Sequence, residues 1–173
     1  LQLANWGYQV HLYEMRDQIQ TPAHKTDGLA ELVCSNSFKG LGSTSAHGLF
    51  KRELRMLGSN LMSAALKARV DAGESLTVDR DLFSEEVMTL ISTNPNITLH
   101  RKEASHIPQD QWTIVAAGPL ASEALTQHLF TLIDSDKLSF FDAIAPVVEA
   151  DSIDFDHAYY KNRWDKGETK DFI

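Results

Sequence analysis

The sequence predicts an α/β fold of the dinucleotide-binding type, in which parallel strands alternate with helices. Three observations favour this fold. An apolar strand pattern over residues 8–14 ends in the acid Glu14, helical and strand patterns then alternate as far as residue 133, and a later strand pattern stops in small residues at 117–118. An acid at one strand end and small residues at another are typical of sheets that bind a nucleotide at their carboxyl edge.

The first predicted element is a helix over residues 1–6 that ends at Gly7, followed by the strand of residues 8–14. In a nucleotide-binding βαβ unit the acid after this strand accepts hydrogen bonds from ribose hydroxyls, about 20 residues after a glycine-rich turn. Counting back that distance from Glu14 passes Leu1. We therefore expect an incomplete unit, with the first strand and the glycine loop absent.

Residues 15–44 form a long polar connection, broken by proline and glycines, with a short apolar patch at 29–33. Connections of this length in a compact domain are usually functional or mobile. This one contains Cys34, the only cysteine of the chain. A lone cysteine forms no internal disulfide, and the ordinary explanation for it is a small side chain buried as filler.

Apolar side chains recur at spacings of three and four between residues 46 and 70, which predicts one amphipathic helix. Its expected outer face carries Lys51, Arg52 and Arg55.

A short strand is expected at 75–78 and another at 97–101, because apolar residues alternate there. Between them, Asp79 or Asp81 can cap a helix that runs to about Ser92.

The apolar run at 113–119 predicts a strand that stops in small residues, and an amphipathic helix is expected over 121–133. Beyond residue 137 the pattern changes to short β-like pieces at 138–141 and 145–148.

This change of pattern divides the chain into a partial nucleotide-binding domain, residues 1–136, and the start of a second or inserted subdomain, residues 137–173. The segment at 159–170 mixes aromatic side chains with both basic and acidic ones. We interpret it as a solvated segment rather than a base-stacking surface.

Composition excludes several classes of protein. The 173 residues are 43% hydrophobic and 23% charged, with no bilayer-length apolar run and no signal-peptide pattern, which predicts a cytoplasmic protein without a membrane partner. The formal net charge of −8 argues against a broad basic surface for nucleic acid. The histidine spacings suggest no metal site. The sequence leaves the oligomeric state unknown.

Several phrases, in their order and spacing, resemble the bacterial folate- and FAD-dependent tRNA (uracil-5-)-methyltransferases, which methylate the T-loop uridine. The phrases are VHLYEMR at 10–16, QTPAH at 20–24, AELVCSNS at 30–37, GLFK at 48–51, TVDR at 77–80, AGPL at 117–120, APVVE at 145–149 and DSID at 151–154. Together they run nearly from end to end of the chain.

The resemblance implies a Rossmann-type FAD-binding domain in which Glu14 holds the adenosine ribose and Arg16 lies close by. The backbone at Ala117 and Gly118 would approach the flavin nucleotide. At this point the family has threonine where this chain has Ala117, which weakens that assignment.

The resemblance also implies that Cys34 is one of two catalytic cysteines, the second of which is not among these residues. A thiolate that adds to C6 of uracil makes C5 nucleophilic, so that C5 takes a one-carbon unit and then loses its proton. The family takes that carbon from methylenetetrahydrofolate, with reduced FAD mediating the reduction and NAD(P)H as reductant. Whether Cys34 acts as nucleophile or as proton acceptor stays open.

Two alternatives accompany this interpretation. The first is a glucose-inhibited-division-type tRNA-modifying flavoprotein, which is similar in fold, although its glycine-rich phrase is not visible near the corresponding loop. The second is a non-catalytic remnant or interaction fragment. In either case we expect residues 1–173 alone to be inactive and to bind FAD weakly, because the glycine loop that receives the pyrophosphate is absent.

Overall fold

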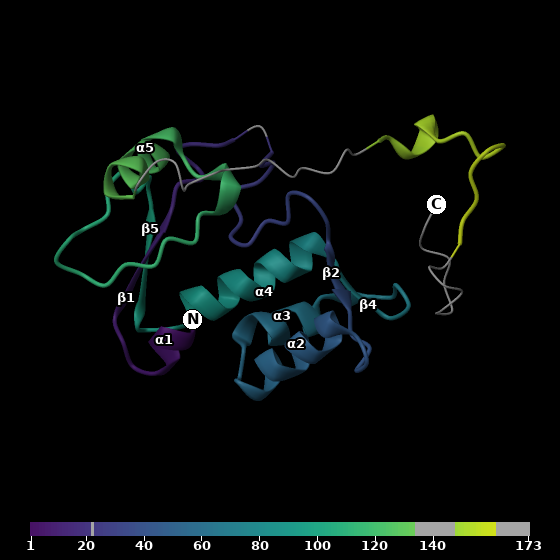
Figure 1. Ribbon diagram of the computed structural model, residues 1–173, viewed down its shortest axis with the longest axis horizontal. Helices are drawn as coiled ribbons and strands as arrows, with labels where there is room; N and C mark the ends of the chain where they lie inside the picture. Colours follow the sequence, from purple (N-terminus) through teal and green to yellow (C-terminus); the bar gives the residue numbers. More distant parts are fainter. Residues whose placement is uncertain (22, 134–147, 162–173) are drawn as a thin grey trace.

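The computed structural model describes residues 1–21, 23–133 and 148–161, and these residues form an α/β structure (Figure 1). The elements, in chain order, are α1 (Gln2–Asn5), β1 (Val10–Glu14), β2 (Ser37–Gly40), α2 (Ala46–Met56), α3 (Asn60–Lys67), β3 (Arg69–Val70), β4 (Ser75–Val78), α4 (Arg80–Ser92), β5 (Ile97–Arg101), the 3-10 turn η1 (Gly118–Leu120), α5 (Glu123–Leu132) and the 3-10 turn η3 (Ala150–Ser152).

Strands β1 and β5 pair in parallel and form a two-stranded sheet. Val10 pairs with Ile97 and Glu14 with Arg101, so both strands end at the same edge of the sheet. The strands predicted at 8–14 and 97–101 are confirmed, the first beginning two residues later than expected. Glu14 therefore stands at a carboxyl edge of parallel strands, which is the place where open α/β sheets bind their ligands.

A second, antiparallel sheet has the strand order β2-β4-β3. The strand expected at 75–78 is confirmed as its central member, β4. Strand β2 lies inside the connection that the sequence analysis left without a strand. The hydroxyl oxygens of Ser37 and Ser75 lie 2.7 Å apart across the pair. Pairing with β4, rather than any local alternation, accounts for this strand, which is irregular between Ser37 and Gly40 and has a φ of +68° at Lys39.

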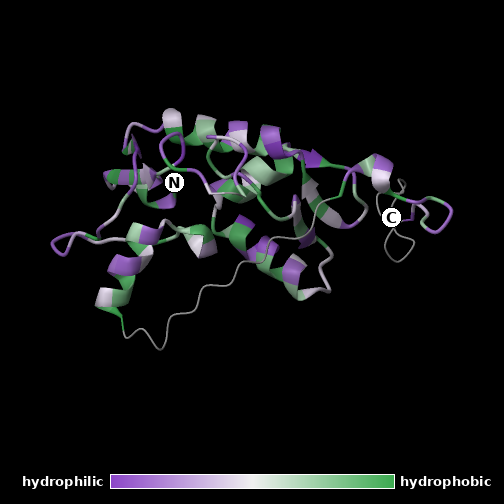
Figure 2. Cartoon of the chain, turned by 90° about the horizontal axis from the view of Figure 1, so that it is seen from above, coloured by the Kyte–Doolittle hydropathy of each residue, from purple (hydrophilic) through white to green (hydrophobic). Residues whose placement is uncertain are grey.

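The single helix expected over 46–70 is wrong, because the chain turns between α2 and α3. Gly58 has a φ of +73°, a conformation that glycine adopts readily and that ends many helices. Ser59 then caps α3 by accepting a hydrogen bond from the Met62 N–H at 3.4 Å. Figure 2 shows hydrophobic and hydrophilic residues side by side along the helices.

Lys51 is also not on an outer face, as the helical pattern suggested, since its side chain is buried in the structure. Its Nζ donates hydrogen bonds to the Gly40 carbonyl at 3.2 Å and to the His47 carbonyl at 3.1 Å. The bond to Gly40 joins α2 to the end of β2, and the bond to His47 lies within α2. Burial lowers the pKa of the Lys51 ammonium.

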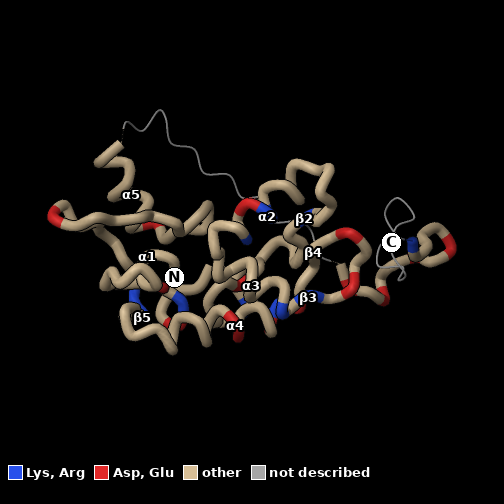
Figure 3. The backbone as a smooth tube through the Cα atoms, turned by 90° about the horizontal axis from the view of Figure 1, so that it is seen from below, with Lys and Arg blue, Asp and Glu red and all other residues tan. Residues whose placement is uncertain are grey.

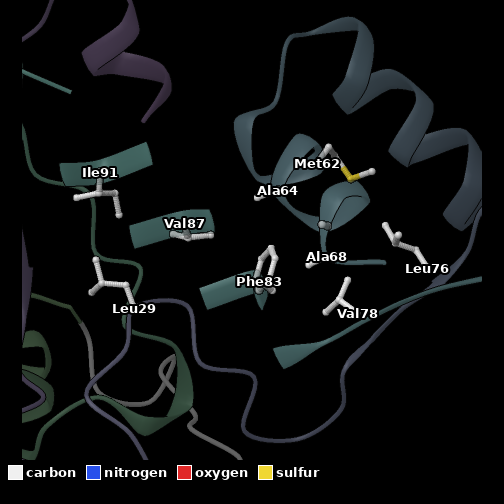
Figure 4. Packing of buried hydrophobic residues seen from close by; sticks show 10 residues of the cluster. Leu29, Met62, Ala64, Ala68, Leu76, Val78, Phe83, Val87 and Ile91 are labelled. Atoms are coloured by element: carbon white, nitrogen blue, oxygen red, sulfur yellow. The ribbon is translucent and has the colours of Figure 1, made fainter. Parts of the chain in front are cut away.

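Helix α4 lies between the two sheets and supplies the centre of the core (Figures 1 and 4). Asp79 caps it by accepting hydrogen bonds from the N–H groups of Asp81 and Leu82, both at 3.0 Å. Its buried face consists of side chains one turn apart, which pack with residues of α3, β4 and the loop before β2: Phe83, Val87 and Ile91 with Leu29, Met62, Ala64, Ala65, Ala68, Leu76 and Val78.

The prediction of a strand at 113–119 is wrong. No strand is assigned there, the side chains from Gln111 to Pro119 are exposed, and Gly118 begins η1. A strand depends on hydrogen bonds to a neighbouring strand, and β1 and β5 pair with each other. The pattern was apolar enough for a strand, but it has no ladder partner in the described part of the chain.

The last predicted helix, at 121–133, is confirmed as α5, with Ser122 as its N-cap. The β-like pieces at 138–141 and 145–147 lie outside the described residues, and so does most of the proposed second subdomain. Among the helices that the structure describes, none has both the length and the apolar character needed to cross a bilayer.

Candidate functional site

The acid that ends β1 is held by an arginine two residues later in the chain. The Arg16 Nε donates to Glu14 Oε1 at 2.9 Å, and the Arg16 Nη2 donates to Glu14 Oε2 at 2.8 Å. The backbone N–H of Arg16 adds a third bond to Oε1, at 3.0 Å. The Arg16 side chain is 6% exposed and that of Glu14 is 19% exposed, so this forked ion pair is largely shielded from water.

A second acid, Glu31, completes the cluster, which we call the Glu14–Arg16–Glu31 clamp. The Arg16 Nη1 donates to Glu31 Oε2 at 3.0 Å. The same carboxylate accepts hydrogen bonds from the Lys25 N–H at 2.8 Å and from the Thr26 hydroxyl at 3.1 Å. The sequence analysis missed Glu31. Its signal was a charged residue inside an otherwise apolar patch, three positions before the cysteine.

The electrostatics of the clamp keep both acids ionised. Burial raises the pKa of each carboxyl, but the hydrogen bonds that each accepts outweigh burial, so the pKa of Glu14 and that of Glu31 are both lowered. For Glu14 the bonds come from Arg16; for Glu31 they come chiefly from the loop backbone. The hydrogen bond to Glu14 raises the pKa of the Arg16 guanidinium.

Cys34 lies in the same loop, and its side chain is exposed. The loop is fixed on both sides of it. Before it, Leu29 is buried in the core and its carbonyl accepts a hydrogen bond from the Ser84 hydroxyl at 2.6 Å. After it, Asn36 and Val78 exchange two bonds, one from the Asn36 side chain at 2.9 Å and one from the Val78 N–H at 3.0 Å. An exposed thiol on an anchored loop is not buried filler.

A cleft of about 770 Å³ opens between the segment after β1 and the start of α5. One side is formed by Met15 and Thr21 and the other by Ser122, with Glu103 and Glu123 contributing carboxylates. Among the described residues that line it, none is a lysine or an arginine. Such a cleft suits an uncharged part of a ligand, such as a nucleoside, better than a phosphate group.

The other predicted ligand-binding residues, Ala117 and Gly118, lie just before this cleft wall, where the chain enters η1. Gly118 has a φ of +66°, and a Cβ built on it meets nothing within 4 Å. The space above this backbone is therefore open to a ligand, as the small residues suggested.

On the outer face of the parallel pair, His11 Nδ1 and His100 Nε2 lie 2.9 Å apart, and the Tyr13 ring stacks on His100 at 4.6 Å. Within the described ranges, no three His, Cys, Asp or Glu side chains gather as a metal site would require.

Parallel strands with an acid at their carboxyl edge, beside a cleft and an open glycine backbone, are typical of α/β proteins that bind nucleotides. A family model described as glucose inhibited division protein A matches residues 1–173. The chain belongs to this family, and the predicted Rossmann-type fold class is confirmed.

The chain is also similar to curated proteins named methylenetetrahydrofolate-tRNA-(uracil-5-)-methyltransferase TrmFO. It is 51% identical to that of Aquifex aeolicus over 95% of this chain and 37% of the relative. For the Zymomonas mobilis protein the identity is 49%, over 99% of this chain and 39% of the relative. For a Staphylococcus epidermidis protein it is 48%, over 97% and 38%. The chain thus spans less than half the length of these relatives. The likeness to the methyltransferases that the sequence phrases indicated is confirmed.

Proposed function

We propose that the whole protein methylates C5 of the T-loop uridine of tRNA, with methylenetetrahydrofolate as carbon donor, reduced FAD, and NAD(P)H as the reductant. The observation that carries this proposal is the exposed Cys34 on an anchored loop, within a phrase that resembles the methyltransferases. The printed names of the relatives support it. A reactive thiol and a reduced flavin both suit the reducing cytoplasm.

FAD fits the residues at the edge of the parallel pair. Glu14 keeps acceptor capacity after binding Arg16, because its Oε2 accepts only one hydrogen bond and has a second lone pair for a ribose hydroxyl, whereas its Oε1 already accepts two. The cleft, with two carboxylates and no cation among its described lining residues, suits the uncharged nucleoside, and the open backbone at Gly118 leaves room for close approach. We therefore assign residues 1–136 to the FAD-binding domain and residues 137–173 to the start of a second subdomain. When bound, the flavin supplies reducing equivalents.

Cys34 would act on the uracil ring directly. As a nucleophile, its thiolate adds to C6 and places electron density on C5, which then attacks the one-carbon unit. As a proton acceptor, it would instead take the C5 proton after that transfer. Either role needs an accessible sulfur at a fixed position, which the loop between Leu29 and Asn36 provides.

Replacing Cys34 by alanine in the whole protein tests the assignment. We expect tRNA methylation to fall below detection while the flavin content, read from the visible absorbance, is unchanged. Ser63→Ala, on the exposed face of α3, is the matched control and should keep both. A Cys34→Ala protein that still methylates at the wild-type rate would rule out a catalytic Cys34.

A tRNA-modifying flavoprotein with different chemistry is the second candidate, and the name of the matching family favours it. The two candidate functions can be distinguished by the modified nucleoside that each produces in tRNA. Mass spectrometry of tRNA nucleosides from cells with and without the gene should show the loss of 5-methyluridine if the first proposal holds. Loss of another modified uridine, with 5-methyluridine retained, would favour the second.

A further inference from the structure

The structure holds a charged bridge between the acid proposed to bind the cofactor and the loop that carries the proposed catalytic thiol. Arg16 is the central member of this bridge. Two of its nitrogens bind Glu14 and a third binds Glu31, at 2.8 to 3.0 Å. A planar guanidinium with three bonds in a shielded place has one orientation, so it fixes the two carboxylates relative to each other.

Glu31 joins this bridge to the loop. Its Oε1 accepts from the Lys25 N–H, and its Oε2 accepts from both the N–H and the hydroxyl of Thr26. With the bond from Arg16, the carboxylate has four donors, and its side chain is 13% exposed. One side chain therefore ties the first half of the loop to the end of β1.

The backbone at this point is also constrained. Ala30, directly before Glu31, has a φ of +57°, a conformation that non-glycine residues seldom adopt and that surrounding contacts must hold. Those contacts are the buried Leu29 on one side and the clamp on the other. Cys34 lies three positions after Glu31, close to this fixed point, so the position of the thiol depends on it.

We propose that Glu31 is a positioning residue for methyl transfer, which acts through Arg16 to hold the Cys34 loop in register with the ribose acid Glu14. This inference rests on the proposed function. It adds that one shared ion-pair cluster fixes the positions of both Glu14 and the Cys34 loop, which are therefore not positioned independently.

The test is Glu31→Gln in the flavin-loaded whole protein, with a tRNA methylation assay. Glutamine keeps the size and an oxygen for the Lys25 N–H, but it removes the charge opposite Arg16. The Glu14–Arg16 pair remains, so flavin content and the KM for tRNA should stay within twofold of wild type. We expect kcat to fall about 10- to 100-fold, since displacement of a reacting group by about 1 Å has an effect of that size.

Glu86→Gln is the matched control, because it breaks an exposed ion pair of 2.8 Å with Lys67 on the surface of α3 and α4 and should leave kcat unchanged. Arg16→Lys should lower kcat as Glu31→Gln does. The kcat of the double variant should be no lower than that of the less active single variant, because both changes break the same bridge.

The outcomes separate this inference from the proposed function. A wild-type protein that binds flavin but methylates no tRNA would overturn the proposed function itself. If the wild type is active and Glu31→Gln keeps its kcat within twofold, the positioning role is wrong. A fall in kcat that only matches a loss of flavin or of folded protein would also overturn it, because that is the result of a purely structural role.

Discussion

At the scale of single residues, the clamp keeps two acids charged: hydrogen bonds from Arg16 do so for Glu14, and hydrogen bonds from the backbone of Lys25 and Thr26 do so for Glu31. The pKa of Glu14 and that of Glu31 lie below the ordinary glutamate value in the folded chain. A group with a lower pKa in the folded state binds fewer protons there than in the unfolded state. Its stabilising contribution is therefore complete above the ordinary value of about 4.3 and is lost as the pH falls through the folded-state value.

This linkage predicts an acid-sensitive contribution to stability. Glu31→Gln should reduce the free energy of unfolding by roughly 1–3 kcal/mol at pH 7, the usual loss for hydrogen bonds to a charged group. The difference from wild type should shrink as the pH falls through the lowered folded-state pKa of Glu31, because the wild-type carboxyl then also becomes neutral. Unfolding by urea at pH 7 and at pH 3.5 measures both values. A difference that is the same at both pH values would contradict the ion-pair explanation.

At the scale of elements, the approach of α2 to the segment after β2 depends on a glycine. A Cβ built on Gly48 lies 2.0 Å from the Gly42 carbonyl oxygen and 2.9 Å from the Leu41 carbonyl carbon, both of which are backbone atoms. A side chain there forces the helix away from the segment. This movement also disturbs the hydrogen bonds that Lys51 donates to the carbonyls of Gly40 and His47.

Gly48→Ala should therefore destabilise the protein, although alanine is the better helix former. We expect a loss of about 1–3 kcal/mol, the range for overpacked sites, measured as a lower thermal unfolding midpoint. Arg52→Ala, exposed on the same helix, is the control and should change stability by less than about 0.5 kcal/mol. A Gly48→Ala protein as stable as wild type would show that the close approach is not needed.

The elements also show what could be predicted from the sequence. Strands β1 and β5 and helices α4 and α5 follow from periodicity and caps, because their patterns are local. The break between α2 and α3 was missed because apolar spacing of three and four continues across it, although Gly58 followed by Ser59 is a stop and a start signal. Strand β2 was missed because partners some 38 residues away make it extended.

The candidate site divides in the same way. Glu14 could be placed at a strand end from its position in the pattern, and Cys34 from a resemblance. Glu31 could not be placed, because its ion pair with Arg16 spans 15 residues of a loop whose path no periodicity describes. The apolar run at 113–119 shows the converse, since strand propensity gives no strand in the described chain without a neighbour to pair with.

At the scale of the whole molecule, the charge of −8 sets limits on what these residues bind alone. Figure 3 shows acidic and basic positions interspersed along the chain rather than gathered by sign. In the described part of the chain, the cleft beside the parallel pair is lined by Glu103 and Glu123 and by no lysine or arginine. Both observations disfavour the pyrophosphate of a dinucleotide more than its nucleoside.

We therefore predict that residues 1–173 alone bind FAD much more weakly than the whole protein does. Flavin fluorescence titration of both at equal ionic strength measures the difference, which we expect to be at least about 100-fold, or roughly 2.7 kcal/mol. Raising the salt concentration should reduce this difference in affinity, because salt screens the charge of the carboxylates. Tight one-to-one binding to residues 1–173 would refute this prediction.

Helix α4 links the two sheets through more than its core face. It has 13 residues and is about 20 Å long. The Ser84 hydroxyl, in its second turn, donates a hydrogen bond to the Leu29 carbonyl. One turn later, the Met88 sulfur accepts a hydrogen bond of 3.6 Å from the Arg101 Nη2 at the end of β5. The helix therefore contacts both the loop that carries Cys34 and the strand edge proposed to bind the cofactor. A tilt of its axis would displace these two parts together, because each is hydrogen-bonded to a side chain of the helix.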